Sequence, residues 1–244
     1  MRLPVNTRQS NPSFPPVMDF SLNTDNITLN PKTTRFVVAS NVVVLLWSIV
    51  CALTNAGWLW ISILAYGFFA AFVIYAWMEK DLLLAKLMVF GLIAGLIELY
   101  SDHWFVVNQS LVYPNDEPML WTSPLYMPFS WVIVFAQLGW YSLLLARSKG
   151  VLISMVVIAI AGGMYIPLYE HLAKNAGWWY YQNSPMIMNA PYYVILAELL
   201  LSLTVAPLMI WTAKNKIALA ALFAAVEGVW IYLAGRIAFQ LLGS

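Results

Sequence analysis

Residues 84–107 read LAKLMVFGLIAGLIELYSDHWFVV, and this stretch decides what kind of fold the chain can form. It is long enough to cross a bilayer, since a helix needs about 20 apolar residues to span roughly 30 Å of hydrocarbon. Its second half nevertheless carries Glu98, Asp102 and His103. Ionisable groups within membrane helices face a protein interior or a water-filled cavity. The stretch therefore predicts a membrane helix with a buried polar face.

The composition extends this prediction to the whole chain of 244 residues. Hydrophobic residues make up 62% and charged residues only 9%, whereas a soluble domain carries roughly 25% charged residues. An ordinary soluble enzyme is therefore excluded. The net charge is +1 and no basic tract is present, so we expect no nucleic-acid partner. The single cysteine, Cys51, cannot form a disulfide within the chain.

Seven apolar stretches are long enough to cross a membrane, and they cover residues 36–54, 57–78, 84–107, 124–145, 151–169, 190–212 and 217–242. They lack the alternation of membrane β-strands, and helices satisfy their own backbone hydrogen bonds in lipid. We therefore predict an all-α, polytopic membrane protein whose transmembrane domain occupies residues 36–244. Residues 1–35, rich in Asn, Pro, Ser and Thr, are predicted to form a polar, irregular tail.

The basic residues predict the orientation of this domain. Ten of the 12 Lys and Arg residues lie in the tail and in the loops after the second, fourth and sixth stretches. The positive-inside rule makes this side cytoplasmic, so we expect the N-terminus inside and the C-terminus outside. The two longest loops then lie outside and are rich in Trp, Tyr, Asn and Pro. An interfacial aromatic belt explains that composition as well as a binding role does.

Acidic residues occur within four of the predicted helices, mostly in their outer halves: Glu98, Asp102, Glu170, Glu198 and Glu227. Each charge costs at least about 2.5 kcal/mol at the bilayer centre unless it faces an interior or a cavity. Arg236 could pair with one of these acids and lock the bundle, which is the structural alternative. Five acids against one arginine leave an excess that such pairing does not explain.

The spacing of Glu98 and Asp102 indicates what these two acids could do chemically. The two residues are four positions apart, so they share one face of a helix. Two carboxylates one turn apart in a low dielectric resist ionising together. At least one is therefore expected to hold a proton near neutral pH, as a general acid must.

Other chemistries are less well supported by the sequence. Two histidines and several carboxylates could form a di-iron or zinc centre, and this metalloenzyme alternative stays open. However, the Glu-x-x-His spacing of di-iron bundles is absent, so we expect no metal and no other cofactor. The chain also lacks a nucleophile elbow and a glycine-rich phosphate loop, which disfavours hydrolases, kinases and ATPases.

Two parts of the sequence resemble each other. In the first, ELYSDHW at 98–104 precedes SPLY at 123–126. In the second, YEH at 169–171 precedes GWWYY at 177–181 and APYY at 190–193. Each unit has an acid and a histidine at the outer end of one helix, an aromatic loop, and a Pro-aromatic start to the next helix. The two units run in the same direction, which predicts a parallel repeat with a site at its interface.

This layout resembles the small integral-membrane carotenoid cyclase and bisanhydrobacterioruberin hydratase family, over residues 85–200. The matching positions are Glu98, Tyr113-Pro114, Pro124, Trp131, Glu170, Trp178-Trp179 and Pro191. The resemblance implies about seven helices in paired units, with an acid on a helix and a tyrosine in an outer loop. It also implies an isoprenoid substrate and cyclisation or hydration as the reaction.

The residues themselves suit this chemistry. Protonation of an isoprenoid alkene gives a carbocation, which cyclises or captures water. A neutral carboxylic acid can deliver the proton, and aromatic faces can stabilise the cation. We expect Glu98 to be the acid, Asp102 or Glu170 to orient it, and Glu198 to act as base or to hold water. Further candidates for substrate contact, each also explained by ordinary packing, are His103, Trp104, Tyr113, Trp131, His171, Trp178, Tyr192 and Glu227.

The sequence thus favours a cofactor-free membrane enzyme that acts on an apolar isoprenoid or other lipid. Its partners would be this substrate and membrane lipids, and the chain could form a homo-oligomer. One alternative is a proton- or ion-coupled transporter or a lipid-binding membrane protein that uses the same acids. Another is a structural subunit of a membrane complex, packed through small residues and aromatic side chains.

Overall fold

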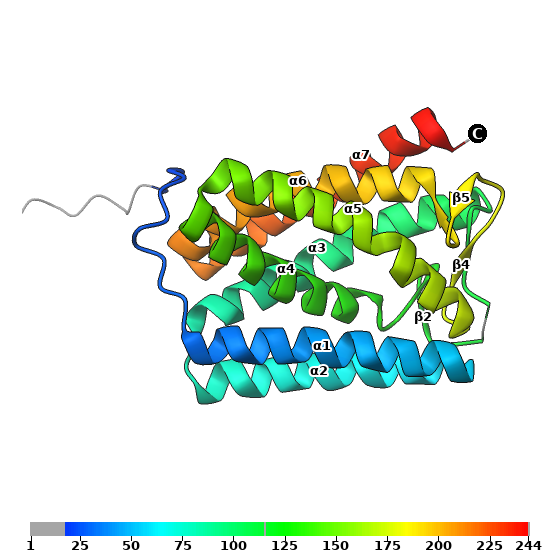
Figure 1. Ribbon diagram of the computed structural model, residues 1–244, viewed down its shortest axis with the longest axis horizontal. Coiled ribbons are helices and arrows are strands. Elements are labelled where there is room, and N and C mark those ends of the chain that lie inside the picture. The colour runs from blue at the N-terminus through cyan, green and yellow to red at the C-terminus, as the bar shows by residue number, and fades with distance from the viewer. Residues whose placement is uncertain (1–17, 115, 244) are drawn as a thin grey trace, which may run out of the picture.

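A computed structural model describes residues 18–114 and 116–243 of the protein and shows a bundle of long helices (Figure 1). Seven helices form within these residues: α1 Pro31–Thr54, α2 Trp58–Met78, α3 Leu82–Val107, α4 Met127–Lys149, α5 Val151–Asn175, α6 Tyr192–Lys214 and α7 Ile217–Leu242. All seven are long and apolar enough to cross a membrane. The prediction of an all-α, multi-pass membrane protein is confirmed.

The largest differences from the predicted helices lie at their ends. Helix α1 begins at Pro31, so the prediction of an irregular tail was wrong for residues 31–35. The side chain of Asn30 caps the helix by accepting a 3.0 Å hydrogen bond from the Lys32 backbone N–H, and proline is favoured at a first helical position. Residues 18–30 contain no helix or strand, and residues 1–17 lie outside the described part of the chain.

Helices α4 and α5 continue beyond the apolar stretches that predicted them. Helix α4 ends at Lys149 and helix α5 ends at Asn175, because polar residues such as Arg147 and Lys174 extend the last turns. Basic side chains suit this position, since they interact favourably with the partial negative charge of a helix C-terminus. Hydropathy therefore ended both helices too early, and it began the fourth helix at 124 although α4 starts at Met127.

Short strands lie in the two long loops at one end of the bundle (Figure 1). They form three antiparallel pairs: β1 (Leu111–Val112) with β4 (Tyr180–Tyr181), β2 (Met119–Leu120) with β3 (Ser123–Pro124), and β5 (Met186–Ile187) with β6 (Ala190–Pro191). The first pair joins the loop after α3 to the loop after α5. The pairing of β1 with β4 thus holds together two loop segments that are far apart in the sequence.

The helices pack as two pairs that α7 joins. Helix α3 packs mainly on α4 and α7, and helix α6 packs mainly on α5 and α7. Helices α1 and α2 cover one face of this core (Figure 1), where α1 contacts α5 and α2 contacts α4. Large apolar side chains such as Leu53 and Trp77 point outward and are 82% and 81% exposed. This outward apolar surface is what lipid requires.

The structure contains the parallel repeat that the sequence predicts. The order α3, β1, β2, β3, α4 recurs as α5, β4, β5, β6, α6. Within it, PMLWTSPLY at 118–126 corresponds to PMIMNAPYY at 185–193. The Leu125 backbone N–H bonds the Pro118 carbonyl at 2.8 Å, and the Tyr192 N–H bonds the Pro185 carbonyl at 3.1 Å. We call residues 118–126 the first hairpin and residues 185–193 the second hairpin.

Within each pair, α3 with α4 and α5 with α6, the two helices approach each other in the same way. A Cβ atom added to Gly95 of α3 would lie 3.1 Å from the Pro128 carbonyl oxygen of α4. A Cβ atom added to Gly163 of α5 would lie 3.4 Å from the Ile195 carbonyl oxygen of α6. Corresponding glycines thus bring corresponding helix backbones together in both halves of the repeat.

Candidate functional site

Five carboxyl groups from four helices form the candidate site, which we call the acid cluster: Glu98 and Asp102 on α3, Glu170 on α5, Glu198 on α6, and Glu227 on α7. Glu98, Asp102, Glu170 and Glu227 are buried, and Glu198 is half-buried. The helix packing therefore brings the acids that the sequence singled out into one region. Isolated charges are costly in such surroundings, so protons or hydrogen bonds must compensate these groups.

Glu98 and Asp102 form the best-connected part of the acid cluster. Tyr113 donates a 2.5 Å hydrogen bond from its hydroxyl to Asp102 Oδ2. Asp102 also hydrogen-bonds with Glu98, and Glu98 hydrogen-bonds with Trp131 of α4. Two carboxyl groups can share a hydrogen bond only when one of them carries a proton. The geometry therefore fits the expectation that this pair holds a proton.

One oxygen of Glu98 is free to act on another molecule. Glu98 Oε2 is buried and has no hydrogen-bond partner among the described residues. Buried polar atoms without a partner are rare in native structures and need an explanation. A substrate group or a water molecule at this oxygen would provide one.

Glu170 occupies the position in the second half that Asp102 occupies in the first. The backbone bond from Asn108 N–H to the Trp104 carbonyl is repeated by the bond from Ala176 N–H to the Leu172 carbonyl. This correspondence places Asp102 and Glu170 at equivalent points of α3 and α5. Trp179 donates a 2.7 Å hydrogen bond to Glu170 Oε2, as Tyr113 does to Asp102. In both halves an aromatic side chain from the following loop holds the acid.

The remaining acids connect the two halves. Thr204 donates a 2.7 Å hydrogen bond to Glu227 Oε2, whereas Glu227 Oε1 has no partner among the described residues. Glu198 lies close enough to interact electrostatically with Glu98, Glu170 and Glu227. Glu198 is therefore the carboxyl that links the acids of the other three helices.

Arg236 does not neutralise the acid cluster. Its Nη1 donates a 2.7 Å hydrogen bond to the Tyr232 hydroxyl, and its guanidinium lies 4.5 Å from the centre of the Trp104 ring. Within the described part of the chain, the ion pairs are Lys32 with Glu79 and Lys214 with Asp19. The predicted alternative, in which Arg236 pairs with Glu227, is therefore not what the structure shows.

The two histidines have partners in the two hairpins and at the end of α5, and not in the acid cluster. His103 Nδ1 lies 3.3 Å from the Thr122 hydroxyl, and its ring stacks on Trp121 at 3.8 Å. His171 lies 2.9 Å from Asn175 through one ring nitrogen and 2.9 Å from Asn189 through the other. Among the described residues, no three His, Cys, Asp or Glu side chains are grouped so that they could hold a metal ion. The donor arrangement thus gives the metalloenzyme alternative no support.

Three of the predicted aromatic contacts also have other surroundings. Trp104 packs against Arg236, Trp178 is fully buried and donates a 3.2 Å hydrogen bond to the Gly57 carbonyl, and Tyr192 is 46% exposed. Of the proposed aromatic residues, Tyr113 and Trp131 contact the acid cluster directly.

Side chains that were not among the predicted site residues complete the site. Trp179 binds Glu170, and Tyr181 interacts electrostatically with both Asp102 and Glu170. Burial, with a further contribution from Glu170, raises the pKa of Tyr181 well above its usual value, so its hydroxyl stays protonated. Alignment of the two repeat units on Asp102 and Glu170 could have identified Tyr181, because Tyr113 and Tyr181 each lie 11 residues after the acid of their unit.

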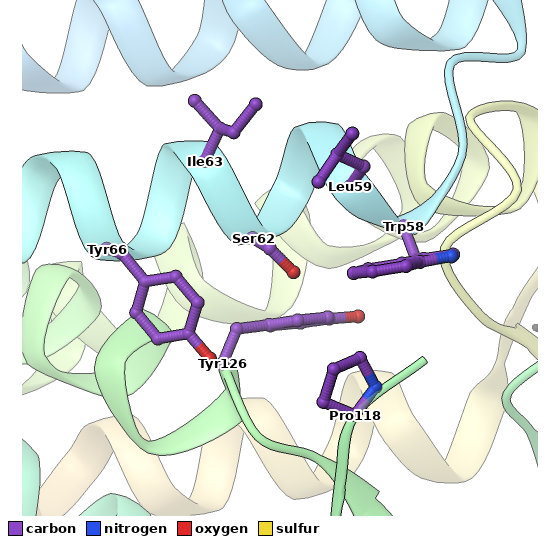
Figure 2. Close-up of a pocket in the computed structure, with 7 residues that line it drawn as sticks. All are labelled: Trp58, Leu59, Ser62, Ile63, Tyr66, Pro118 and Tyr126. Carbon is purple, nitrogen blue, oxygen red and sulfur yellow. The ribbon is translucent and has the colours of Figure 1, made fainter. Parts of the chain in front are cut away.

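A cavity of about 310 Å³ lies between α2 and the loop that precedes α4 (Figure 2). Its lining consists of Trp58, Leu59, Ser62, Ile63, Tyr66, Pro118 and Tyr126. Tyr126 of this lining interacts electrostatically with Asp102 of the acid cluster. Burial raises the pKa of Tyr126 well above its usual value, so it too keeps its proton.

The fold and the site define a seven-helix membrane protein with a cluster of buried acids that form no ion pair within the described part of the chain. The chain belongs to the family described as Domain of unknown function (DUF6989), which matches residues 99–242. The match includes Asp102, Glu170, Glu198 and Glu227, and Glu98 directly precedes it. Neither a curated protein nor a solved structure matches the chain.

Proposed function

We propose that this membrane protein is an enzyme that protonates an apolar isoprenoid or another unsaturated lipid and so promotes its cyclisation or hydration. One observation carries the proposal: Glu98 keeps an unpartnered, buried oxygen while it shares a hydrogen bond with Asp102. An acid of this kind can hold a proton in apolar surroundings and release it to a substrate.

The reaction assigns a role to each part of the acid cluster. The O–H bond of Glu98 breaks, a C–H bond forms at one alkene carbon, and the positive charge remains on the other carbon. In cyclisation, a second alkene attacks this cation and a proton leaves the product. In hydration, water adds to the cation and then loses a proton. Glu198, which interacts with Glu98, accepts that proton, and Trp131 stabilises the cation through its ring.

The resemblance to membrane carotenoid cyclases and hydratases supports the same reaction class. The positions that carry it include Glu98, Tyr113 and Trp131, which contact one another through the acid cluster. Basic residues gather at the opposite end of the bundle, which supports a cytoplasmic N-terminus and an outer acid cluster. Substrate would then reach the acids from the outer half of the bilayer.

Metabolite analysis tests this proposal. Isoprenoid-producing cells would express the protein or its Glu98→Gln variant, and apolar metabolites would be compared by mass spectrometry. We expect a product that has gained one water, or an isomer of unchanged mass, with the unmodified protein alone. Glu79→Gln is the matched control, because Glu79 pairs with Lys32 at the other end of the bundle. Equal product from Glu98→Gln would exclude Glu98 as the acid.

A coupled transporter is the second candidate, because the acids reach towards the middle of the bundle. Glu227 lies near the centre of α7, keeps one unpartnered oxygen, and interacts with Glu198. Such a line of carboxyl groups could relay protons. Proton flux into liposomes that contain the purified protein, lost in Glu227→Gln, would favour transport over catalysis.

A further inference from the structure

The two hairpins have the same backbone pattern but different surroundings. Tyr126 ends the first hairpin and Tyr193 ends the second, and both side chains are buried. Rings of Phe105, Tyr181 and Phe239 pack around Tyr193, with centres 4.9–6.2 Å away. Tyr126 instead lines the cavity of about 310 Å³. The first half of the repeat thus leaves open a space next to its tyrosine, whereas aromatic rings pack against the tyrosine of the second half.

Glu117, the residue before the first hairpin, lies next to this cavity. It directly precedes Pro118, which lines the cavity, and it interacts electrostatically with Tyr126. Glu117 is 5% exposed, and neither of its carboxyl oxygens has a partner among the described residues. Burial raises the pKa of Glu117 to about 7. The burial of this carboxyl without a partner therefore lowers the free energy of unfolding.

The second half of the repeat shows that the hairpin itself does not require an acid. The position that corresponds to Glu117 is Ser184, which donates a 3.3 Å hydrogen bond to the Gly243 carbonyl. Both hairpins nevertheless close with the same backbone bonds. Glu117 thus has no part in the hairpin fold, which points to a ligand as the reason for its position.

The cavity wall carries hydroxyl groups and apolar side chains, and Glu117, which is outside the lining, interacts electrostatically with Tyr126 of that wall. The Tyr126 hydroxyl is buried and has no partner in the described part of the chain. Figure 2 shows that Trp58 and Pro118 flank the hydroxyl end of Tyr126 and that the Ser62 hydroxyl points to its ring. Leu59 and Ile63 provide apolar walls that face the lipid side of α2. A ligand that fits has an apolar body and one small polar end.

We propose that this cavity binds the hydroxyl end of an uncharged lipid alcohol, with Glu117 and Tyr126 as its hydrogen-bond partners. The inference rests on the proposed function and names its substrate class, because Tyr126 interacts electrostatically with Asp102 of the acid cluster that would act on the apolar chain. An alcohol fits better than an amine, since the apolar lining would have to strip water from an ammonium group. An alcohol both donates and accepts a hydrogen bond, as a protonated carboxyl does.

Equilibrium binding of radiolabelled geranylgeraniol to the purified protein tests this inference. The comparison ligand is the matching hydrocarbon, in which hydrogen replaces the hydroxyl. We expect Glu117→Met and Tyr126→Phe each to weaken alcohol binding by roughly tenfold, as loss of a hydrogen bond predicts. Hydrocarbon binding should be the same in all variants. Ser184→Ala is the matched control, because it changes the corresponding position of the other hairpin.

Thermal unfolding separates a ligand role from a structural one. Removal of an unpartnered buried carboxyl should leave the Tm of Glu117→Met unchanged or raised. A lowered Tm would show that Glu117 holds the loop together and would overturn the inference. Equal affinity for alcohol and hydrocarbon, or wild-type alcohol binding by both variants, would also overturn it. Turnover that is lost in Glu98→Gln would then still support the proposed function by itself.

Discussion

The Tyr113 hydroxyl lies 2.5 Å from Asp102 Oδ2, so a loop residue holds an acid that belongs to a membrane helix. Burial and the charge of Asp102 raise the pKa of Tyr113 well above its usual value, so the phenol remains a donor. The bond fixes one oxygen of Asp102 and orients the carboxyl that contacts Glu98. Tyr113 is thus a positioning residue for the proposed acid.

Replacement of this donor should lower turnover without unfolding the protein. We expect Tyr113→Phe to reduce product formation by roughly tenfold, which is the usual effect of one lost hydrogen bond. Product would be measured by mass spectrometry in cells that contain equal amounts of folded protein. Tyr100→Phe is the matched control, since Tyr100 is on α3, the helix that carries Asp102, and is 62% exposed. Unchanged product formation with Tyr113→Phe would show that Tyr113 does not position Asp102 for the reaction.

Trp179 should matter for stability through its bond to Glu170. Trp179→Phe keeps a ring but leaves Glu170 Oε2 without its donor, so we expect a loss of about 1–3 kcal/mol in the free energy of unfolding. Thermal unfolding in detergent measures this effect as a lower Tm. Trp77→Phe should have little effect, because Trp77 is 81% exposed on α2. Equal Tm values for the two variants would contradict the assigned role.

Gly95 should be essential to the contact between α3 and α4. An added Cβ would lie 2.6 Å from the Trp131 Cβ and 3.1 Å from the Pro128 Cα, so the helices would have to move apart. We expect Gly95→Ala to lower the Tm and to displace Trp131 from Glu98. Gly67→Ala on α2 is the control, because a Cβ there meets no atom within 4 Å. A normal Tm for Gly95→Ala would mean that α3 and α4 are more loosely packed.

Glu117 should make stability depend on pH. Burial raises its pKa to about 7 in the folded state, above the value of about 4.3 in an unfolded chain. The folded state therefore binds this proton more tightly, and the stabilisation is complete below pH 4.3 and is lost as pH rises through 7. We expect the Tm to fall between pH 5 and 8 more steeply in the wild type than in Glu117→Gln. Parallel curves would show that Glu117 is not buried in this way.

Cysteine labelling tests the proposed orientation. In a Cys51→Ser background, Asp116→Cys would place a thiol in the exposed loop before the first hairpin. Lys216→Cys would place one between α6 and α7 at the other end. We expect an impermeant reagent to label the first variant in intact cells and the second only after the membrane is opened. The reverse pattern would invert the topology.

The sequence alone predicted the helices and part of the site, because these features depend on local patterns. An apolar run of about 20 residues suffices to define a membrane helix, and only the helix ends needed correction, as at Pro31. The four-residue spacing of Glu98 and Asp102 placed them on one helical face. The short echo between the two halves predicted the parallel repeat.

Only the tertiary structure decided which side chains meet across helices. The packing of α7 on α3 directs Arg236 to Trp104 and Tyr232 and not to Glu227. The pairing of β1 with β4 carries no local sequence signal, because it joins two loops far apart in the chain. The burial of Glu117, beside polar and charged loop residues, likewise depends on how its loop docks on α2. Contacts of this kind follow from helix crossings and loop docking, which hydropathy and spacing do not encode.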